Sequence, residues 1–555
     1  MINTKNGFQL LDAEGRPMPS AASYKASDSL SRELKCWQPP LQSADRAMLP
    51  EKARTEGRAK DMVRNNGYAR GAVQNQKDRI VGAKYKLQLQ PVYKLLGITA
   101  AVAAAWASEV EVAFHAWADD PDCWIDAQRK RTFSQFVREM SGTEMVQGEG
   151  FLVRQWRPSP SGYATCFTTV EPERVSTPDV QGLGAHREEV MPNGNRVRAG
   201  VEMDAWGAAV AYHIRTKHQQ DYGYLSSSAM GEWDRVPKVN EFGWRQVIHL
   251  FEVENADQTR GFSAMASTLQ KLKMMDVQED LELQLSQLST AFAMYIKTPL
   301  GRQRAKEIMG ADDEEGMTRF MQMCMAAQEA FYGDSGVSIN GVKLPTLYPD
   351  DEIGVLQPHN QASNHEQFKE GLMRQNARGW GMSFEEASGD FSKTSYSSAR
   401  AAMQIAWQYV LAKRAAIADK AATLMMRLWF DEAIVRGTVK PPPGVKYWPD
   451  SSTKMGQVFA WLTNCSWIGA GKIVLDEFKQ AKANEVGLAT HQVELSEVLA
   501  ESGTDIERVL DGHVRAREMF EERGLPLPEY LGGVPMTART PEQRAADDKL
   551  ADDQE

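Results

Sequence analysis

The feature that most constrains this chain is a long segment, from Tyr396 to about Arg436, that contains neither proline nor glycine. Small and apolar side chains recur along it at helical spacing, so it predicts one unusually long helix. Before it, a shorter helical pattern breaks at Gly379-Trp380-Gly381, and a polar loop runs from there to Ser395. A polar, hinge-like loop between two stiff helices indicates a part that moves or touches something, and it is not typical of a catalytic pocket.

The rest of the chain mixes helical and strand patterns, which predicts an α+β fold. At 555 residues the chain is too long for one ordinary core, so three or four structural regions are expected. Helical periodicity is present at 46–82 with a break at Asn65-Asn66-Gly67, and at 100–116, 133–145, 263–295, 364–380, 473–483, 490–501 and 506–523. Short strand patterns are present at 85–90, 150–156, 167–170, 201–203, 209–214 and 247–251.

Composition excludes several classes of protein. A hydrophobic content of 42% with 25% charged residues is that of a soluble globular protein. The most apolar run, Leu95 to Trp106, is shorter than a membrane-spanning helix requires, and no secretory signal pattern is visible, so we expect no membrane association. The net charge of −10 argues against a protein that holds nucleic acid tightly. It permits either no contact with DNA or a surface past which DNA slides without sticking.

The charge is unevenly distributed. Between Asp45 and Lys86 there are eleven lysines and arginines and five acidic residues, a local excess of +6. A solvated helix face explains this excess with the fewest assumptions. A basic patch for DNA or for a partner protein is the sharper interpretation, and the sequence leaves both open.

A search for reactive groups yields no positive candidate for a catalytic, cofactor or metal site. Gly469-Ala470-Gly471-Lys472 lacks the earlier glycine and the hydroxyl of a nucleotide-binding loop, so we interpret it as the start of a helix. The nine histidines have no paired metal-ligand spacing. The five cysteines include no C-x-x-C pair and are expected to be free, buried thiols. We therefore expect a protein that is not an enzyme.

The region around the loop resembles the portal proteins of tailed bacteriophages, and specifically the lambda-like portal family. The resemblance rests on residues 375–385 (QNARGWGMSFE) and 394–400 (TSYSSAR). Five further segments match the family in the same order, so the resemblance spans roughly residues 30 to 525. They are 63–69 (VRNNGYA), 78–82 (DRIVG), 129–133 (RKRTF), 258–261 (QTRG) and 464–469 (NCSWIG).

The resemblance implies a phage portal fold with an α+β wing, a two-helix stem, a small α/β clip, a long helix and a helical C-terminal region, assembled as a ring. Its expected parts are a flexible N-terminal arm (1–44), the wing (45–259), the first stem helix (260–295), the clip (296–357), the second stem helix (358–382), the tunnel loop (383–395), the long wing helix (396–440), a crown-side C-terminal helical region (441–530) and a disordered tail (531–555). Family members can also lose N-terminal residues during maturation.

Three groups of residues are candidates for function within such a ring. The tunnel loop places Ser388, Asp390, Ser392, Lys393 and Thr394 beside the channel, where Lys393 would touch a phosphate and Asp390 would pair with a neighbouring subunit. The alternative is that both are surface charges on a mobile loop. Carboxylates of the first stem helix are candidate channel lining or a solvated face: Asp276, Glu279 and Asp280. The acidic run of the clip is a candidate docking patch or a helix cap: Asp312, Asp313, Glu314 and Glu315.

The resemblance also implies partners and location. The subunit would form a ring with about a dozen copies of itself, closed by head-to-tail interfaces. It would contact the major capsid protein and scaffold, the terminase large subunit, a head-completion protein and the double-stranded DNA in the channel. It would be found at a unique vertex of the virion, and in the host cytoplasm during assembly. Two rival hypotheses are a cytoplasmic oligomeric helical scaffold or adaptor without DNA passage, and an enzyme of an unrecognised class.

Overall fold

The computed structural model of the chain describes residues 36–178, 188–218, 232–291, 362–447, 452–474, 477–528 and 531–532, together with short pieces of 2–34 and 295–354. The chain divides into two compact units. Unit 1 comprises residues 1–56, 126–128 and 148–262, and unit 2 comprises 57–125, 129–147 and 263–555. Mixed helix and sheet agrees with the α+β class that the sequence predicts.

Unit 1 consists mainly of two antiparallel sheets. In the three-stranded sheet the order is β11-β4-β5, formed by Val247–Phe251, Glu149–Trp156 and Thr165–Val170. In the five-stranded sheet the order is β10-β9-β8-β7-β6, formed by Trp233–Pro237, Ala209–Arg215, Val201–Met203, Arg196–Arg198 and Glu188–Val190. Apolar side chains from both sheets, including Phe151, Tyr212 and Val247, form one core. The strand predictions at 150–156, 201–203, 209–214 and 247–251 are therefore confirmed.

A buried ion cluster lies in unit 1. Glu149 has no exposed surface, and its carboxylate accepts hydrogen bonds from Arg260 Nε at 2.9 Å and from the Gly261 N–H at 2.9 Å. Lys52 Nζ lies 3.0 Å from Glu149 Oε1, and His249 Nε2 lies 2.9 Å from Glu149 Oε2. Although burial alone raises the pKa of Glu149, Arg260 and Lys52 outweigh it and hold the pKa well below its ordinary value.

Unit 2 is mainly helical. Helix α1 (Ala44–Asn65) belongs to unit 1 up to Glu56 and to unit 2 beyond it. Asn66 then caps the next helix, accepting a hydrogen bond from the Ala69 N–H at 3.0 Å, so the predicted break at Asn65-Asn66-Gly67 is confirmed. The other helices up to residue 147 are α2 (Gly67–Ile80), α3 (Tyr93–Leu96), α4 (Ala100–Ala118) and α5 (Phe133–Gln147).

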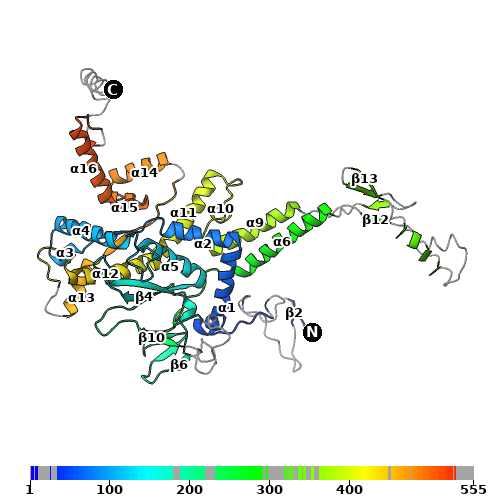
Figure 1. The fold of residues 1–555 in the computed structure, drawn as a ribbon, viewed down its shortest axis with the longest axis horizontal. Coiled ribbons are helices and arrows are strands. Elements are labelled where there is room, and N and C mark those ends of the chain that lie inside the picture. The colour runs from blue at the N-terminus through cyan, green and yellow to red at the C-terminus, as the bar shows by residue number, and fades with distance from the viewer. Residues whose placement is uncertain are drawn as a thin grey trace, which may run out of the picture. The chain divides into compact units, whose positions relative to one another are not determined.

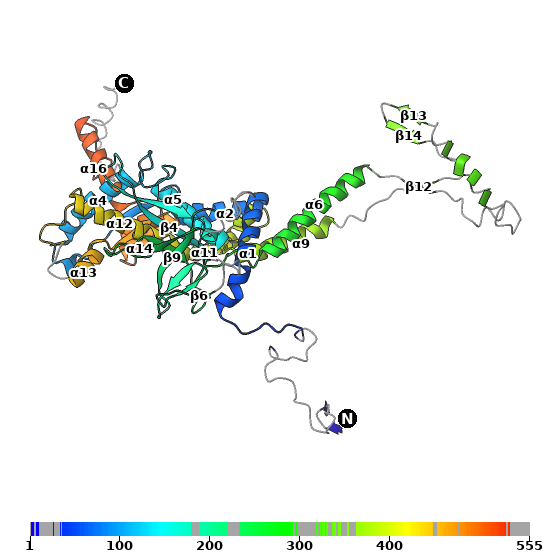
Figure 2. The ribbon, with the colours of Figure 1, turned by 60° about the horizontal axis from the view of Figure 1, so that its bottom comes forward.

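Helices α6 (Leu269–Ala291) and α9 (Ala362–Gly379) run side by side in both ribbon views (Figures 1 and 2). Met265, Leu269 and Leu272, at and just before the start of α6, pack with Met373 and Trp380 in one core cluster. The segment between the two helices is described only in pieces, which include β12 (Tyr295–Lys297) paired with β15 (Glu352–Gly354), and β13 (Gly336–Ile339) paired with β14 (Val342–Pro345). Asp312, Asp313, Glu314 and Glu315 lie outside the described residues.

The long segment without proline or glycine is helical throughout. Helix α11 (Tyr396–Lys413) continues through a π-helical turn, Arg414–Asp419, into α12 (Lys420–Arg436), and Gly437 ends it with a left-handed cap at φ 74°. Arg414, at the start of the π turn, donates hydrogen bonds to the Ile80 and Ala470 carbonyls at 2.8 Å each. The prediction of one continuous helix is confirmed, and the widened turn is a feature that periodicity cannot show.

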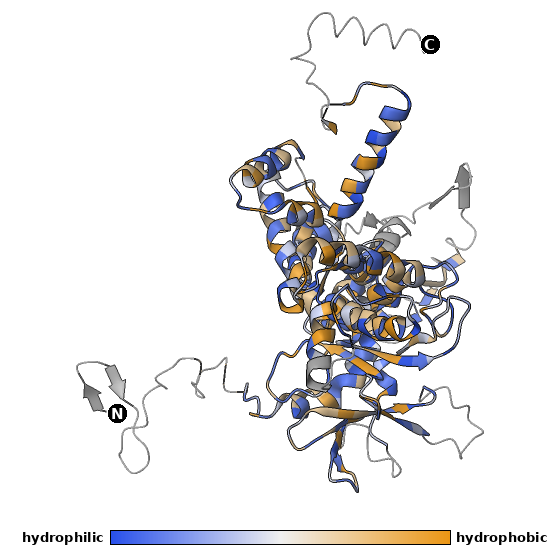
Figure 3. Cartoon of the chain, turned by 90° about the vertical axis from the view of Figure 1, so that its left-hand side faces the viewer, coloured by the Kyte–Doolittle hydropathy of each residue, from blue (hydrophilic) through white to orange (hydrophobic). Residues whose placement is uncertain are grey.

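Strand β3 (Lys86–Leu89) confirms the strand predicted at 85–90. It pairs antiparallel with β16 (Cys465–Ile468), a strand that the sequence did not predict. Tyr85 and Trp467 stack with ring centroids 5.6 Å apart, and Phe114, Phe133 and Trp429 lie around them. The helices of the C-terminal region are α13 (Ser452–Leu462), α14 (Glu477–Ala489), α15 (Leu495–Glu501) and α16 (Ile506–Glu522). Hydrophobic and hydrophilic residues alternate along α16, which has no buried residue (Figure 3).

The predictions about the cysteines and about the basic segment 45–86 are partly wrong. Cys36, Cys123, Cys166 and Cys465 are free, but only Cys166 is buried. Cys324 lies outside the described residues. The basic segment 45–86 is not a uniformly solvated face, because Lys52 and Arg79 are buried in ion pairs. No helix within the described ranges is long and apolar enough to cross a membrane.

Candidate functional site

The candidate site begins where α9 ends. Trp380 is fully buried and its indole N–H donates to Thr268 Oγ1 at 2.9 Å. A side chain at Gly379 would meet Thr268 Cγ2 at 2.5 Å, and one at Gly381 would meet the Tyr409 ring at 2.4 Å. Gly381 is also left-handed, with φ 71°. Both glycines are therefore required by close packing around the helix end, and the break at Gly379-Trp380-Gly381 is confirmed.

The first half of the predicted loop is a short helix. Ser383 and Glu386 form a reciprocal capping box for α10 (Phe384–Ser388), and Gly389 ends that helix at φ 72°. The interpretation of Phe384–Ser388 as polar loop is therefore wrong. A helix of one and a half turns gives too little periodicity to be recognised. The spacing of Ser383 and Glu386 is the signal that would have found it.

Helix α10 is anchored to α2 by a buried ion pair. Glu386 Oε2 lies 2.8 Å from Arg79 Nη1, and the two side chains are 5% and 8% exposed. Asn75 donates to the Glu386 carbonyl at 3.3 Å. Burial lowers the pKa of Arg79, and the Glu386 charge opposes that shift. Removing either partner would leave a desolvated charge, so this contact fixes the start of the loop.

The second half of the predicted loop is exposed and carries two of the candidate charges. Lys393 Nζ donates to Glu366 at 3.0 Å and also to Glu370, both on α9. These hydrogen bonds raise the pKa of Lys393. Asp390 Oδ1 accepts from the Ser392 N–H at 2.9 Å, and hydrogen bonding from the Ser392 side chain, together with this backbone contact, lowers the pKa of Asp390. The Lys393 and Glu366 side chains are 55% and 70% exposed, so solvent screens this pair and Lys393 is able to exchange Glu366 for another anion.

The three hydroxyl candidates in this segment support its turns. Ser388 Oγ donates to the Phe384 carbonyl at 2.7 Å and accepts from the Asp390 N–H at 3.1 Å. Thr394 Oγ1 donates to Glu385 at 3.0 Å. Ser392 contributes its backbone N–H to Asp390. All five candidates therefore lie in one segment, and each has a partner within the chain.

The acidic candidates on α6 differ in exposure. Asp276 lies 3.0 Å from Lys273 Nζ and accepts from Asn66 Nδ2 at 3.3 Å. Glu279 lies 2.6 Å from Lys369 Nζ, an ion pair that links α6 to α9. Asp280 is exposed. Asp276 and Glu279 are thus partly neutralised within the chain, which leaves Asp280 as the most available of the three carboxylates.

An open groove of about 560 Å³ brings two of the candidate groups together. Its lining includes Asp276 and Glu279 from α6 and Ser388 and Gly389 from the end of α10. Asp390, Ser392, Lys393, Thr394 and Asp280 do not line it. Part of the predicted loop and part of the predicted acidic face are therefore neighbours, although over a hundred positions separate them in sequence.

Two further features bear on metal and nucleotide binding. Within the residues that the structure describes, no group of three or more histidine, cysteine or acidic side chains is placed to hold a metal ion. Gly469-Ala470-Gly471-Lys472 is an irregular segment that follows β16, and α14 begins only at Glu477. The prediction that this motif starts a helix is therefore wrong.

Comparison with known proteins identifies the chain. The family model described as "Phage portal protein, lambda family" matches residues 30–414. The portal protein of Escherichia phage N15 is 33% identical over 90% of this chain and 91% of its own length. Portal protein B of Escherichia phage lambda is 32% identical over 93% of this chain and 92% of its own.

A weaker similarity exists to a solved neck structure. The neck of a native gene transfer agent particle, computed with C12 symmetry, gives a TM-score of 0.40 at 12% identity, covering 82% of this chain and 99% of the other. That score is too low to support an argument, so the assignment rests on sequence. Because the family model covers more than half of the chain and two relatives match about nine-tenths of it, the chain belongs to the lambda family of phage portal proteins.

Proposed function

We propose that this chain is the portal subunit of a tailed phage, closing into a ring of about a dozen copies at one vertex of the capsid. Double-stranded DNA would enter through the ring during packaging and leave through it during ejection. The observation that carries this proposal is the family match over residues 30–414, which includes the loop and the first part of the long helix. The family is structural, so we assign no catalytic role.

Within this ring, α6 and α9 are the proposed stem and residues 296–357 the proposed clip. The clip would dock the terminase large subunit, which supplies ATP hydrolysis, and later the head-completion protein. The wing (45–259) and the crown-side region (441–530) would meet the major capsid protein and scaffold. The subunit would assemble in the host cytoplasm and remain in the virion.

The segment 383–395, which comprises helix α10 and the exposed stretch after it, is the proposed tunnel loop. Its first half is held by the buried Arg79–Glu386 pair, while its second half is exposed and held by the ion pairs of Lys393 at the surface. This combination supports a fixed base with a tip that exchanges contacts as DNA passes. Carboxylates of α6 along the channel would repel phosphates and keep the polymer from adhering to the wall.

Electron microscopy of the purified full chain tests the ring directly. We expect closed rings with an axial hole wide enough for duplex DNA. Monomers or open filaments under all conditions would contradict the portal assignment. Closed assemblies without such a hole would instead favour an oligomeric scaffold or adaptor through which no DNA passes.

Deleting 388–394 tests the loop. We expect rings to form normally, because the anchoring contacts of Glu386 lie outside the deletion, while the amount of DNA packaged or retained per head falls. A control is deletion of 241–243, the exposed tip of a turn in unit 1. If the loop deletion prevents ring assembly, the segment is an interface between subunits and the tunnel-loop assignment is wrong.

A further inference from the structure

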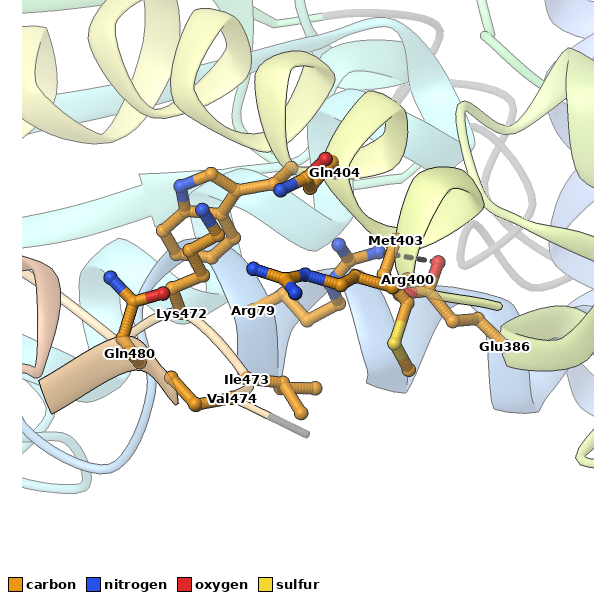
Figure 4. Close-up of a pocket in the computed structure, with 10 residues that line it drawn as sticks. Arg79, Glu386, Arg400, Met403, Gln404, Lys472, Ile473, Val474 and Gln480 are labelled. Carbon is orange, nitrogen blue, oxygen red and sulfur yellow. Dashed lines mark hydrogen bonds and ion pairs between the residues drawn. The ribbon is translucent and has the colours of Figure 1, made fainter. Parts of the chain in front are cut away.

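A second pocket lies beside the anchored end of the loop, within unit 2. Its cavity is about 40 Å³ and it is lined by residues from five segments (Figure 4). Three of the lining residues are cations, Arg79 from α2, Arg400 from α11 and Lys472 from the segment after β16. Glu386 is the one carboxylate in the lining, so the pocket carries a formal charge of +2. Two carboxamides, Gln404 and Gln480, add polar groups without charge.

Donors in this pocket lack protein partners. Arg79 uses Nη1 for its ion pair with Glu386, but its Nε is fully buried and has no hydrogen-bond partner in the part of the chain that the structure describes. Such a buried donor costs about 1–3 kcal/mol unless something satisfies it. Among the described residues, the side chains of Arg400 and Lys472 have no hydrogen-bond or ion-pair partner. In Figure 4 the charged ends of Arg400 and Lys472 project into the same opening.

The glycines before Lys472 hold it in place. A side chain at Gly469 would meet the Ile80 carbonyl oxygen at 2.7 Å, and one at Gly471 would meet the Ser502 backbone at 2.7 Å. Arg414 binds the Ala470 carbonyl, and the Lys472 N–H donates to the Glu501 carbonyl at 2.8 Å. The segment is therefore braced by its neighbours on both sides. Because the Lys472 N–H is already used, the segment does not wrap a nucleotide as a phosphate-binding loop does.

We propose that this pocket binds a single phosphate group, held by Arg400 and Lys472 with Arg79 Nε as a third donor. A tetrahedral dianion offers enough oxygens for donors that arrive from three separate segments, and it matches the local charge. The cavity has room for a few waters, each of which needs about 10–15 Å³, and such a group would replace them. The phosphate would come either from the free ion or from a nucleic acid, and both share this chemistry.

Titration calorimetry of the full-length protein with sodium phosphate tests the site, with sodium chloride at equal ionic strength as the reference. We expect saturable binding of phosphate, weakened at least about tenfold by Arg400→Gln or Lys472→Gln, because each change removes a charge-assisted hydrogen bond. Lys420→Gln is the matched control, since it removes an exposed positive charge from the same continuous helix as Arg400. It should bind phosphate like the parent protein.

Duplex oligonucleotides distinguish the two sources of phosphate. If duplexes with and without a 5′-phosphate compete equally for the site, it takes phosphates of the DNA backbone. If only the 5′-phosphorylated duplex competes, it takes a DNA end, and if neither competes, it takes the free ion. The proposal is overturned if phosphate gives no saturable heat, or if both pocket variants bind as tightly as Lys420→Gln. Ring formation does not depend on this result, so the portal proposal is tested separately.

Discussion

Glu149 shows how one residue stabilises a whole unit. It is fully buried among Arg260, Lys52 and His249, so its charge offsets two desolvated cations. We expect Glu149→Gln, which keeps the shape and removes the charge, to destabilise the protein by about 3–5 kcal/mol. Thermal unfolding of the full chain measures the effect.

The control for this change is Glu188→Gln. Glu188 pairs with Arg198 on the surface, where its side chain is 39% exposed. Ion pairs of this kind contribute about 0–1 kcal/mol, so the control should unfold close to the parent. Equal losses for both variants would mean that the buried cluster does not stabilise unit 1.

Glu111 makes the stability of the protein depend on pH. Burial raises its pKa to about 8, although the Leu89 N–H donates to it and favours the charged form. Between pH 4.5 and 8 the Glu111 carboxyl therefore keeps its proton in the folded state, whereas in the unfolded state, where its pKa is near the ordinary 4.5, it has released the proton. The stability from this group is present below pH 4.5 and is lost as pH rises towards 8. Glu111→Gln should remove that dependence and raise the unfolding temperature at pH 8.5, but not at pH 4.5.

Glu109→Gln is the comparison for the pH experiment. Glu109 is an exposed residue two positions earlier on α4, and the substitution removes the same formal charge. It should leave the slope of stability against pH between 5 and 8 unchanged. If Glu111→Gln also leaves that slope unchanged, Glu111 is ionised in the folded protein at neutral pH.

At the scale of elements, a comparison of two glycines separates the energetic cost of backbone conformation from the cost of packing. Gly381 and Gly389 have nearly the same left-handed φ, 71° and 72°, but a side chain at Gly381 meets Tyr409 whereas one at Gly389 meets nothing within 4 Å. Alanine should cost about 1–2 kcal/mol at Gly389 for conformation alone. At Gly381 a further cost of about 1–3 kcal/mol is expected from overpacking. Thermal unfolding of both variants measures the difference, and equal losses would contradict the close approach to Tyr409.

The elements that the sequence predicted correctly are those whose pattern lies in residues close together along the chain. The long helix, the strands of unit 1 and the break at Gly379-Trp380-Gly381 are each encoded by residues that are neighbours in sequence. Strand β16 was missed because Cys465–Ile468 finds its partner at Lys86–Leu89. The Arg79–Glu386 pair and the cluster around Glu149 were missed for the same reason. Only the fold brings residues so far apart in sequence into contact.

For the whole molecule, the charge on α6 gives a test in the assembled ring. If Asp280 faces the channel, Asp280→Lys places one positive charge per subunit around the DNA path, about a dozen in all. DNA should then adhere to the wall, so translocation slows and the DNA packaged per head falls while rings still form. An in vitro packaging assay measures this.

Glu241→Lys reverses a charge in an exposed turn of unit 1 and is the control for that experiment. It should package DNA like the parent. If Asp280→Lys packages as well as Glu241→Lys does, α6 does not present Asp280 to the DNA. The acidic face of α6 could be predicted from the sequence. Its partners could not, because Asp276 contacts Asn66 and Lys273, and Glu279 contacts Lys369, only in the folded chain.

The pairing of β3 with β16 has a consequence for how the protein is made. The ribosome releases residues 86–89 early and residues 465–468 only when most of the chain has been synthesised. Until then Leu87 and Tyr85, which are buried in the finished structure, lack their sheet partner and the Trp467 ring. A nascent chain that ended at residue 414, the limit of the family match, would lack this partner altogether. Completion of this core therefore waits until residues 465–468 have been synthesised, so it cannot form co-translationally with the first helices.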